Sequence, residues 1–509
     1  MKSSTSSALT AALVGVVIGV LAVLLAQNIS ERSRGIKTTY EDWRKLNLIL
    51  NHVDGNYVDT VDRKKLTDAA VTAALSALDP HSVYLPPQER VRSEENLAGG
   101  FFGIGIQFNV PNDTAVVIEV IPGGPSEKAG LLPGDRLLSV DGVNIAGCKY
   151  PQDSMVRRMR GDDGTKVKLQ IRRSGETIPF EITRGKIPEH SVDASFMVDD
   201  TLGYVRLSKF SRTTWTEFRQ AVGTLRGSGM KTLILDLRDN VGGYLDQALL
   251  LSDSFLEKGD TIVYIEGLHR RREDYVASGR GEFKDIGLKL LINEQSASSS
   301  EILAGAMQDN GRATIYGRRS FGKGLVQEPV NFTDGSGMRL TVARFYTPSG
   351  RCIQKPYTED YELEIYKRYA DGEMVDADSM KLHNGGIYPD VFVPVDTTRA
   401  TDFFIKCNRK ATTMRFASYW FDRHRDELLG VDSYPELLEY LDESNLDRAF
   451  LSFASTRDAL VPRKGEWEES KEYMMPQIQA LVGRYSPLGD SAFYHIYLQI
   501  DDVFKTAAQ

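Results

Sequence analysis

The sequence predicts an α/β protein with a β-rich insertion and helical regions on both sides. Between residues 187 and 398, short apolar runs of strand length alternate with segments of helical periodicity. Residues 99–186 differ, because glycine-rich turns separate short β-branched segments there. Apolar residues recur at helical spacing in 38–98 and again in 399–509. A chain of 509 residues has the length of roughly three or four domains.

Composition and charge exclude several classes of function. Apolar residues make up 41% of the chain, which is enough for real hydrophobic cores. The net charge of −8 is spread along the sequence and argues against nucleic acid as the main partner. The three cysteines (Cys148, Cys352 and Cys407) are too few and too scattered for a disulfide framework or a metal site. The seven histidines form no HxxxH pair, so we expect neither a metal nor a cofactor.

The region 1–37 contains an apolar segment that predicts export. Residues 8–26 are uncharged and, apart from Thr10, apolar. Nineteen such residues can just cross a bilayer, whereas the apolar core of a cleaved signal peptide is usually shorter. We favour an uncleaved signal-anchor in the inner membrane over a removed signal peptide. In either case the rest of the chain would lie in the cell envelope, on the periplasmic side.

Two helical patterns lie between residues 40 and 78. The first carries Trp43, Leu46 and Val53, and the second carries Leu66 and Leu75. Asp-Pro-His-Ser follows the second pattern and ends it, because proline disfavours the helical conformation in the residue before it. The apolar residues of these helices could form a partner surface or pack on the neighbouring domain, and both alternatives stay open.

Residues 99–186 begin with a glycine-spaced loop that enters an alternating strand at 102–108, and a β-branched strand follows at 115–121. A turn then leads into a short helix at 123–131, and an Asp-Gly turn closes the strand pattern of 133–142. Together these features resemble a PDZ domain. The resemblance implies that a peptide tail adds a strand to the sheet edge while backbone N–H groups hold its carboxylate. The residues of that cradle would be Gly103, Ile104 and Gly105; the alternative is a groove that is occluded or merely structural.

A serine cluster and a glycine-bracketed lysine stand out in the α/β region. Residues 288–292 have the length of a buried strand, and 301–307 have the pattern of a buried helix. The serines between them therefore lie at a helix N-terminus, which presents unpaired N–H groups and the positive end of a dipole. Lys323 follows between two glycines. A nucleophile and a neutral-amine base need these residue types, although a capped helix and a flexible turn would give the same pattern.

A second candidate anion site follows the apolar strand 232–237. The turn Arg-Asp-Asn-Val-Gly-Gly at 238–243 leads into another helix, and backbone N–H groups at such a junction can point at an anion. The same turn can also serve only close packing. A histidine triad has no comparable support, because His190 and His269 lie in no motif that would position them.

In combination, these segments resemble the carboxy-terminal processing peptidases, also called tail-specific proteases. The resemblance extends over roughly residues 40–395 and keeps the order of that family. Besides the PDZ pattern, it rests on LDPHSVYL (78–85), DLRDNVGG (236–243), SASSSEILAGAM (296–307), SFGKGLVQ (320–327), YTPSGRCIQ (346–354) and GGIYPD (385–390). It implies an α/β protease core of the crotonase and ClpP type with an inserted PDZ domain.

The resemblance also implies catalytic roles. Ser298 matches the nucleophile, Lys323 the general base and Gln327 the residue that orients the lysine. The oxyanion donors would be the backbone N–H groups of Ser299 and of one glycine of the pair Gly242 and Gly243. Many relatives carry alanine where this chain has Ser299, so the crowded hydroxyls leave open which serine attacks.

These features predict an exported serine endopeptidase that recognises C-terminal tails of proteins through its PDZ domain and cleaves by a Ser-Lys acyl-enzyme mechanism. One alternative is a catalytically inactive scaffold that binds tails. Another is a crotonase-like acyl-CoA enzyme, which would give the PDZ domain and the export segment no role. Expected partners are substrates with free tails and the membrane, while a homo-oligomer or a regulatory partner stays open. The acidic insertion 357–383 and the region 399–509 have no counterpart in the minimal family pattern, so either could serve regulation or assembly.

Overall fold

The computed structural model describes residues 44–98, 100–110, 113–121, 123–188, 190–358, 361–380, 384–398 and 401–509. Its contacts divide the chain into two compact units, with the boundary between Leu78 and Asp79. The apolar segment 8–26 lies outside the described residues. No helix in the described ranges has both the length and the apolar content that a membrane span requires.

The first unit contains two helices, as the sequence predicts. One extends over 44–56, and the other, α2, over Arg63–Ser76. Asp62 caps α2, because its side chain accepts a hydrogen bond from the backbone N–H of Lys65 at 3.1 Å. Leu48 of the first helix is 58% exposed, so this helix presents apolar surface.

A six-stranded sheet forms the centre of the second unit, in the order β10 (Val192–Met197), β11 (Leu202–Leu207), β12 (Thr232–Asp236), β15 (Gly287–Ile292), β16 (Thr314–Gly317) and β19 (Val391–Phe392). β10 is antiparallel to β11, and the neighbouring strands from β11 to β19 are parallel. Every residue of β11 is buried, as expected for a strand that is covered on both faces.

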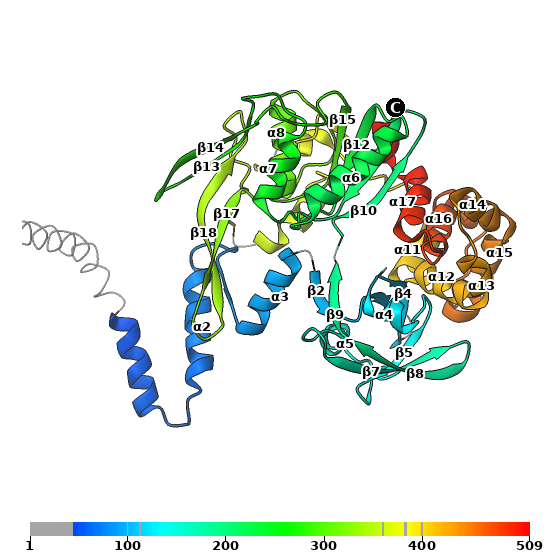
Figure 1. Ribbon diagram of the computed structural model, residues 1–509, viewed down its shortest axis with the longest axis horizontal. Helices are drawn as coiled ribbons and strands as arrows, with labels where there is room; N and C mark the ends of the chain where they lie inside the picture. Colours follow the sequence, from blue (N-terminus) through cyan, green and yellow to red (C-terminus); the bar gives the residue numbers. More distant parts are fainter. Residues whose placement is uncertain are drawn as a thin grey trace, which may run out of the picture. The chain divides into compact units, whose positions relative to one another are not determined.

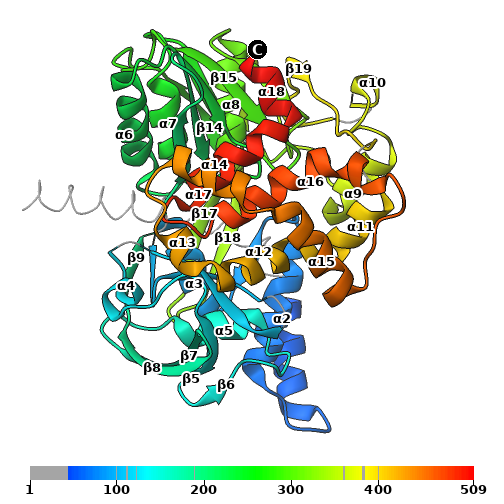
Figure 2. The ribbon, with the colours of Figure 1, turned by 90° about the vertical axis from the view of Figure 1, so that its right-hand side faces the viewer.

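Helices cover both faces of this sheet (Figure 2). On one face, α6 (Thr214–Gly227), α7 (Leu245–Asp253) and α8 (Ser299–Asp309) share a hydrophobic core with the strands. On the other face, η3 (Leu498–Ile500) and α18 (Asp502–Ala508) pack against β11, β12 and β15. The last residues of the chain therefore supply one layer of the α/β core.

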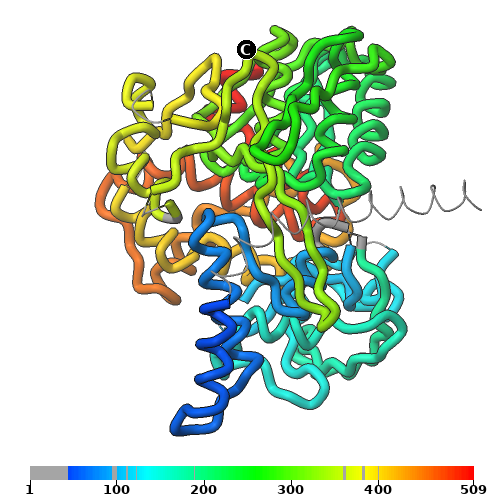
Figure 3. The backbone as a smooth tube through the Cα atoms, turned by 90° about the vertical axis from the view of Figure 1, so that its left-hand side faces the viewer, coloured from blue at the N-terminus to red at the C-terminus, as the bar shows by residue number. Residues whose placement is uncertain are grey.

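A second sheet of this unit contains β1 (Val83–Leu85), β18 (Gly337–Tyr346), β13 (Thr261–Gly267) and β14 (Arg270–Val276), with β17 (Leu325–Asn331) paired to β18. β17 begins directly after the glycine-bracketed lysine. Its pairing with β18 forms a long hairpin that extends away from the helices of the core (Figures 1 and 3).

The PDZ-like region has a sheet and a hydrophobic core of its own. The sheet has the order β3 (Ile106–Asn109), β4 (Ala115–Val120), β5 (Arg136–Val140), β7 (Lys166–Arg173) and β8 (Glu176–Thr183), with β6 (Val143–Asn144) on β5. Every second residue of β7 is buried, as expected for a strand with one face on a core. The other elements are α3 (Pro87–Ala98), β2 (Gly100–Gly103), α4 (Pro125–Ala129), α5 (Gln152–Met159) and β9 (Gly185–Pro188).

The C-terminal region is helical, as the sequence predicts, and has an aromatic core that includes Phe416, Phe421 and Phe450. It contacts the PDZ-like region through an ion pair between Arg136 and Asp422. Its helices are α11 (Asp402–Arg409), α12 (Thr412–Arg423), α13 (Arg425–Leu429), α14 (Tyr434–Glu443), α15 (Leu446–Asp458), α16 (Glu466–Gly483) and α17 (Gly489–Tyr497). The insertion forms η2 (Tyr361–Leu363), α9 (Glu364–Ala370) and α10 (Ala377–Met380).

Candidate active site

Three turns meet at one edge of the central sheet, because they follow the neighbouring parallel strands β12, β15 and β16. Sites in α/β sheets usually lie at the carboxyl ends of such strands. The turns 237–244, 293–298 and 318–324 border a cleft of about 1030 Å³. The structure brings the predicted catalytic and oxyanion residues to this cleft, whose lining includes Gly242, Gly243, Ser298, Ser299, Lys323 and Gln327.

Ser298 differs from the serines beside it. Its φ of 56° and ψ of −113° form a conformation that residues with a side chain rarely adopt. The hydroxyls of its neighbours donate to backbone carbonyls: Ser296 to Leu237 at 2.8 Å, Ser299 to Gly243 at 3.0 Å and Ser300 to Asn240 at 2.9 Å. Among the described residues the Ser298 hydroxyl donates to no carbonyl, and its side chain lines the cleft. Ser298 is thus the serine of the cluster that lines the cleft without donating its hydroxyl to a carbonyl of the described residues.

Glu301 links Ser298 to the turn that carries Lys323, a role that no catalytic motif of the sequence had indicated. One carboxylate oxygen accepts from the backbone N–H groups of Ser298 and Lys323, both at 2.8 Å. The other accepts from the Gly322 N–H at 2.7 Å and from the Ser320 hydroxyl at 2.5 Å. Glu301 is fully buried, and burial raises its pKa. The spacing Ser-x-x-Glu of a capping box was the signal that could have identified it.

Lys323 lies partly buried in the cleft without a carboxylate partner. Burial lowers the pKa of its amine, and the positive charge of Arg339 lowers it further. The negative charges of Glu301 and Asp79 act in the opposite direction without reversing the shift. Among the described residues, the Lys323 amine forms no ion pair. Its surroundings therefore favour the neutral amine more than water does.

The two glycines beside Lys323 allow its loop to approach the segment after β18. A Cβ atom on Gly324 would lie 2.8 Å from the backbone nitrogen of Gln354. Gly322 has φ 89°, and a Cβ atom there would lie 3.0 Å from the Lys355 side chain. A side chain on either side of Lys323 would therefore collide with the neighbouring segment. At Gly322 the positive φ also favours glycine.

Gln327 and His81 occupy the same wall of the cleft. The Gln327 amide nitrogen donates to the His81 carbonyl oxygen at 2.5 Å, so the amide oxygen is the polar atom that remains. The His81 ring lies 2.6 Å from the Tyr361 hydroxyl through Nε2. Burial and the positive charge of Lys323 lower the pKa of His81 to about 4. Among the described residues, no group of three or more His, Cys, Asp or Glu side chains is arranged to hold a metal ion.

The glycine turn distinguishes between its two candidate oxyanion donors. The Gly242 N–H donates to the side-chain oxygen of Asn240 at 2.9 Å. Within the described residues, the N–H groups of Gly243 and Ser299 have no acceptor. A Cβ atom on Gly242 would lie 2.8 Å from the Ala297 carbonyl oxygen and 2.9 Å from the Ser299 nitrogen. Gly242 therefore lets the turn lie close to residues 297–299. The Gly243 N–H is the one of the two that lacks an acceptor among the described residues.

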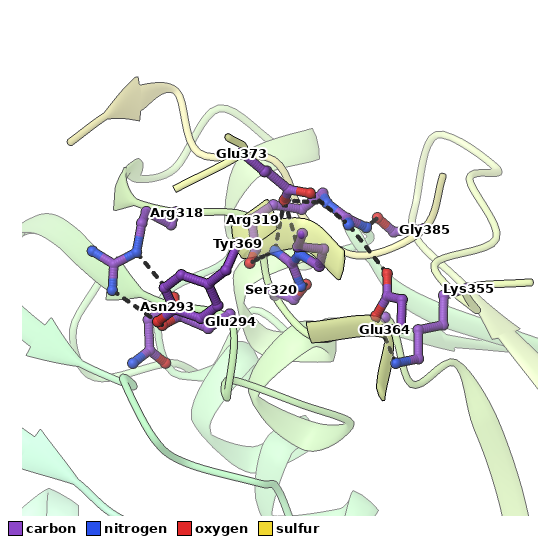
Figure 4. A network of polar contacts seen from close by, with 12 residues as sticks. Asn293, Glu294, Arg318, Arg319, Ser320, Lys355, Glu364, Tyr369, Glu373 and Gly385 are labelled. Atoms are coloured by element: carbon purple, nitrogen blue, oxygen red, sulfur yellow. Dashed lines mark hydrogen bonds and ion pairs between the residues drawn. The ribbon is translucent and has the colours of Figure 1, made fainter. Parts of the chain in front are cut away.

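The insertion holds the lysine loop through a buried network of charges (Figure 4). Arg368 of α9 donates to the carbonyl oxygens of Arg319 at 2.7 Å and Ser320 at 3.2 Å. The Arg319 side chain in turn donates to Glu373 at 2.8 Å, and Glu373 also accepts from Arg368 at 3.0 Å. Arg319 and Ser320 belong to the turn 318–324, so these contacts fix the first half of the turn that carries Lys323. The insertion is therefore a structural support of the candidate site.

The predicted carboxylate cradle borders a second cavity, of about 530 Å³. Ile104 and Gly105 line it, whereas Gly103 ends β2 and lies outside the lining. The carbonyl oxygens of Ile104 and Gly105 accept from Ser126 and Ile121, at 2.9 Å and 3.1 Å. The N–H groups of Ile104 and Gly105 have no acceptor among the described residues. Two of the three predicted residues thus present N–H groups at this cavity.

Comparison with known proteins identifies the two main parts of the chain. Residues 201–363 match Peptidase family S41, and residues 103–183 match the PDZ domain. These matches agree with the α/β region and the PDZ-like sheet that the structure contains.

Relatives extend the match across most of the chain. A carboxy-terminal-processing protease of Bartonella bacilliformis is 36% identical over 341 residues, which cover 65% of this chain and 76% of the relative. A "probable CtpA-like serine protease" of Staphylococcus haemolyticus is 33% identical over 336 residues, with 65% and 67% covered. The solved photosystem II D1 C-terminal processing protease is 28% identical, with 68% and 91% covered and a TM-score of 0.38. The chain therefore belongs to the carboxy-terminal-processing serine proteases of peptidase family S41 and contains a PDZ domain.

Proposed function

We propose that this protease cleaves peptide bonds by a serine–lysine acyl-enzyme mechanism, with Ser298 as nucleophile and Lys323 as general base. The observation that carries the proposal is the convergence of the serine junction, the lysine loop and the glycine turn on one cleft. Each contributes a group that acyl transfer requires: a hydroxyl, an amine that burial drives toward its neutral form, and backbone N–H donors.

The proposed reaction has two halves. Ser298 Oγ attacks the carbonyl carbon of the scissile bond while Lys323 Nζ takes the hydroxyl proton. The N–H groups of Gly243 and Ser299 stabilise the oxyanion, and Lys323 then gives the proton to the leaving amine. In the second half, Lys323 Nζ takes a proton from a water molecule whose oxygen attacks the acyl ester, and it returns that proton to Ser298 Oγ as the ester bond breaks.

Gln327 is proposed to orient the lysine. Its amide nitrogen is already engaged by the His81 carbonyl oxygen, so its amide oxygen can accept from the Lys323 amine. The amide is neutral and so adds no negative charge that would raise the pKa of the lysine.

The PDZ domain is proposed to recognise free C-terminal tails of protein substrates. The tail would lie along β3, the edge strand of its sheet, with its carboxylate on the N–H groups of Ile104 and Gly105. Gly103 would contribute to the shape of that loop, because a Cβ atom there would lie 3.1 Å from the Phe101 ring.

Export and inner-membrane anchoring are proposed from the sequence of 8–26 alone. The full chain should then fractionate with membranes, whereas a chain that begins at Lys37 should be soluble and should cleave the same substrates. Recovery of a soluble mature protein that begins between Gln27 and Arg34 would favour a removed signal peptide instead.

The mechanism is tested with a fluorophosphonate probe and an unfolded protein substrate that has a free C-terminal tail. The full chain should be labelled at Ser298 and should cleave the substrate, and Ser298→Ala should do neither. Ser299→Ala and Ser300→Ala should stay active. An active Ser298→Ala enzyme, or a wild-type enzyme that binds tails without cleaving them, would overturn the proposed mechanism.

A further inference from the structure

The cavity beside Ile104 and Gly105 is shared by three parts of the chain. The PDZ domain supplies one side, from β3, β4 and α5. The start of β10 and the residues after β11 supply a second side, and the segment 487–491 at the start of α17 supplies a third. The C-terminal helical region therefore forms part of the wall of the groove in which a tail would lie.

Contacts on two sides hold the C-terminal helical region that carries the segment 487–491. On the side of the PDZ domain, the Arg425 guanidinium donates to the Pro133 carbonyl oxygen at 2.5 Å. On the side of the protease core, the His495 ring of α17 stacks on Phe196 of β10, with 4.2 Å between the ring centres. The helices that carry this wall therefore contact both the PDZ domain and the protease core.

The open edge of β3 determines which way the side chains of a bound tail would point. Ile106 and Phe108 pack on the PDZ core, whereas the exposed Gln107 is paired with Glu119 of β4. Side chains of an added strand alternate in the same manner. With the last side chain of the tail on the apolar floor near Ile104, the penultimate side chain lies on the face of Gln107 and Glu119, and a long side chain there can reach across Gln107 toward Glu119.

The groove is acidic on this side. Glu119, Asp193 and Asp490 all line it. Asp490 pairs with Arg484 at 2.5 Å, and Asp193 accepts from the Ser208 hydroxyl at 2.7 Å. Among the described residues, Glu119 has neither a hydrogen bond nor an ion pair. Burial and the charge of Asp490 raise the pKa of Glu119, whereas the charges of Arg484 and His190 lower it. A further cation beside Glu119 would favour its ionised form and pair with it.

Cations lie at both ends of the groove, and two of them, Arg484 and His190, act on Glu119. The Arg160 guanidinium lies 3.8 Å from the centre of the Phe101 ring, next to the carboxylate cradle. Lys209 and His190 lie on the side of the protease core. The groove thus offers the positive charge of Arg160 where the tail ends, and Glu119 is the carboxylate of its lining that has no ion pair among the described residues.

We propose that the groove selects protein tails with lysine or arginine at the penultimate position. Glu119 would be the specificity-determining residue, and the segment 487–491 would confine the basic side chain. This inference rests on the tail recognition proposed above and adds to it a substrate class.

The test uses the full chain with Ser298→Ala, so that peptides bind without being cleaved. Fluorescent peptides that differ only in a penultimate Lys, Gln or Glu are titrated by anisotropy, and an amidated Lys peptide is included. We expect the Lys peptide to bind roughly three- to tenfold more tightly than the Gln peptide, and the Glu peptide to bind weakest. The differences in affinity among the three peptides should become smaller as salt is added.

A second set of titrations adds Glu119→Gln, with Glu176→Gln on the exposed face of β8 as the matched control. The Lys preference should vanish in the first variant and persist in the second, with unchanged affinity for the Gln peptide in both. Equal binding of the three free-acid peptides by the wild-type groove would overturn this inference alone. Equal binding of the amidated and free-acid peptides would instead overturn the proposed tail recognition.

Discussion

Lys323 and Lys355 lie in neighbouring segments of the protease core, and burial lowers the pKa of both. Their partners differ. The Lys355 amine lies 2.7 Å from a Glu364 carboxylate oxygen and 4.0 Å from the centre of the Phe321 ring. Lys323 has no ion pair among the described residues, and the nearby charge that acts most on it is the positive Arg339. One amine is thus stabilised as a cation within the fold, and the other is not.

The difference indicates that burial alone does not make a lysine a base. A buried amine that keeps a carboxylate partner retains its proton and supports the structure. A buried amine without such a partner loses the proton more readily, because its charged form has lost hydration without compensation. Substitutions of the two lysines and of the groups around Lys323 test this distinction.

Replacing each lysine by methionine should separate the two roles. Lys323→Met should lower kcat/KM by on the order of 10⁴-fold and leave the free energy of unfolding within about 1 kcal/mol of wild type. Lys355→Met should retain chemistry but lose about 3 kcal/mol of stability, because Glu364 loses a buried partner. Peptide cleavage and urea unfolding measure the two effects. A Lys323→Met enzyme that cleaves at the wild-type rate would contradict the assignment of Lys323 as the base and of Lys355 as the structural lysine.

Glu301→Gln should reduce kcat by about 10²-fold with little change in KM. The NH2 group of the new amide would face backbone N–H groups that now donate to a carboxylate oxygen. Two donors repel each other, so the backbone at Ser298 and Lys323 would shift. Stability should fall by about 1–3 kcal/mol. Ser320→Ala, which removes only one of the four donors, is the matched control and should be milder. An equal loss in both variants would argue against a positioning role for the carboxylate.

Arg368→Met should loosen the lysine loop from outside the cleft. We expect roughly tenfold lower kcat, because the carbonyl oxygens of Arg319 and Ser320 lose the guanidinium that holds them. Tyr366→Phe changes an exposed side chain of the same helix, and it should be near wild type. Wild-type kinetics in a folded Arg368→Met enzyme would show that the insertion supports stability only.

Activity should rise with pH through the lowered pKa of Lys323, since the neutral amine is the reactive form. Arg339→Gln removes the positive charge that helps to lower this pKa. The acidic limb of the kcat/KM profile should therefore move to higher pH, by about half a unit to one unit. Arg339→Lys keeps the charge and should keep the limb in place. A shift to lower pH on Arg339→Gln would contradict the assignment of Lys323 as the base.

Several parts of the fold and the site were predictable because they depend on neighbours in sequence. The apolar runs 232–237 and 288–292 predicted strands, found at Thr232–Asp236 and Gly287–Ile292. The PDZ pattern and the helical C-terminal region were also predicted, and the family assignment is confirmed. That Ser298 and Lys323 line one cleft agrees with the motifs that contain them.

Only the tertiary structure decided which groups surround those residues. The sequence alone left two candidate oxyanion glycines open, and in the structure the Gly242 N–H donates to Asn240 while the Gly243 N–H has no acceptor among the described residues. The support from Arg368 and the closeness of His81 to Lys323 also depend on segments distant in sequence. Strands, turns and helices depend on residues that are close in sequence, so local patterns predict them. The burial of a side chain, the partners of its hydrogen bonds and the walls of a groove depend on segments that meet only in the folded chain.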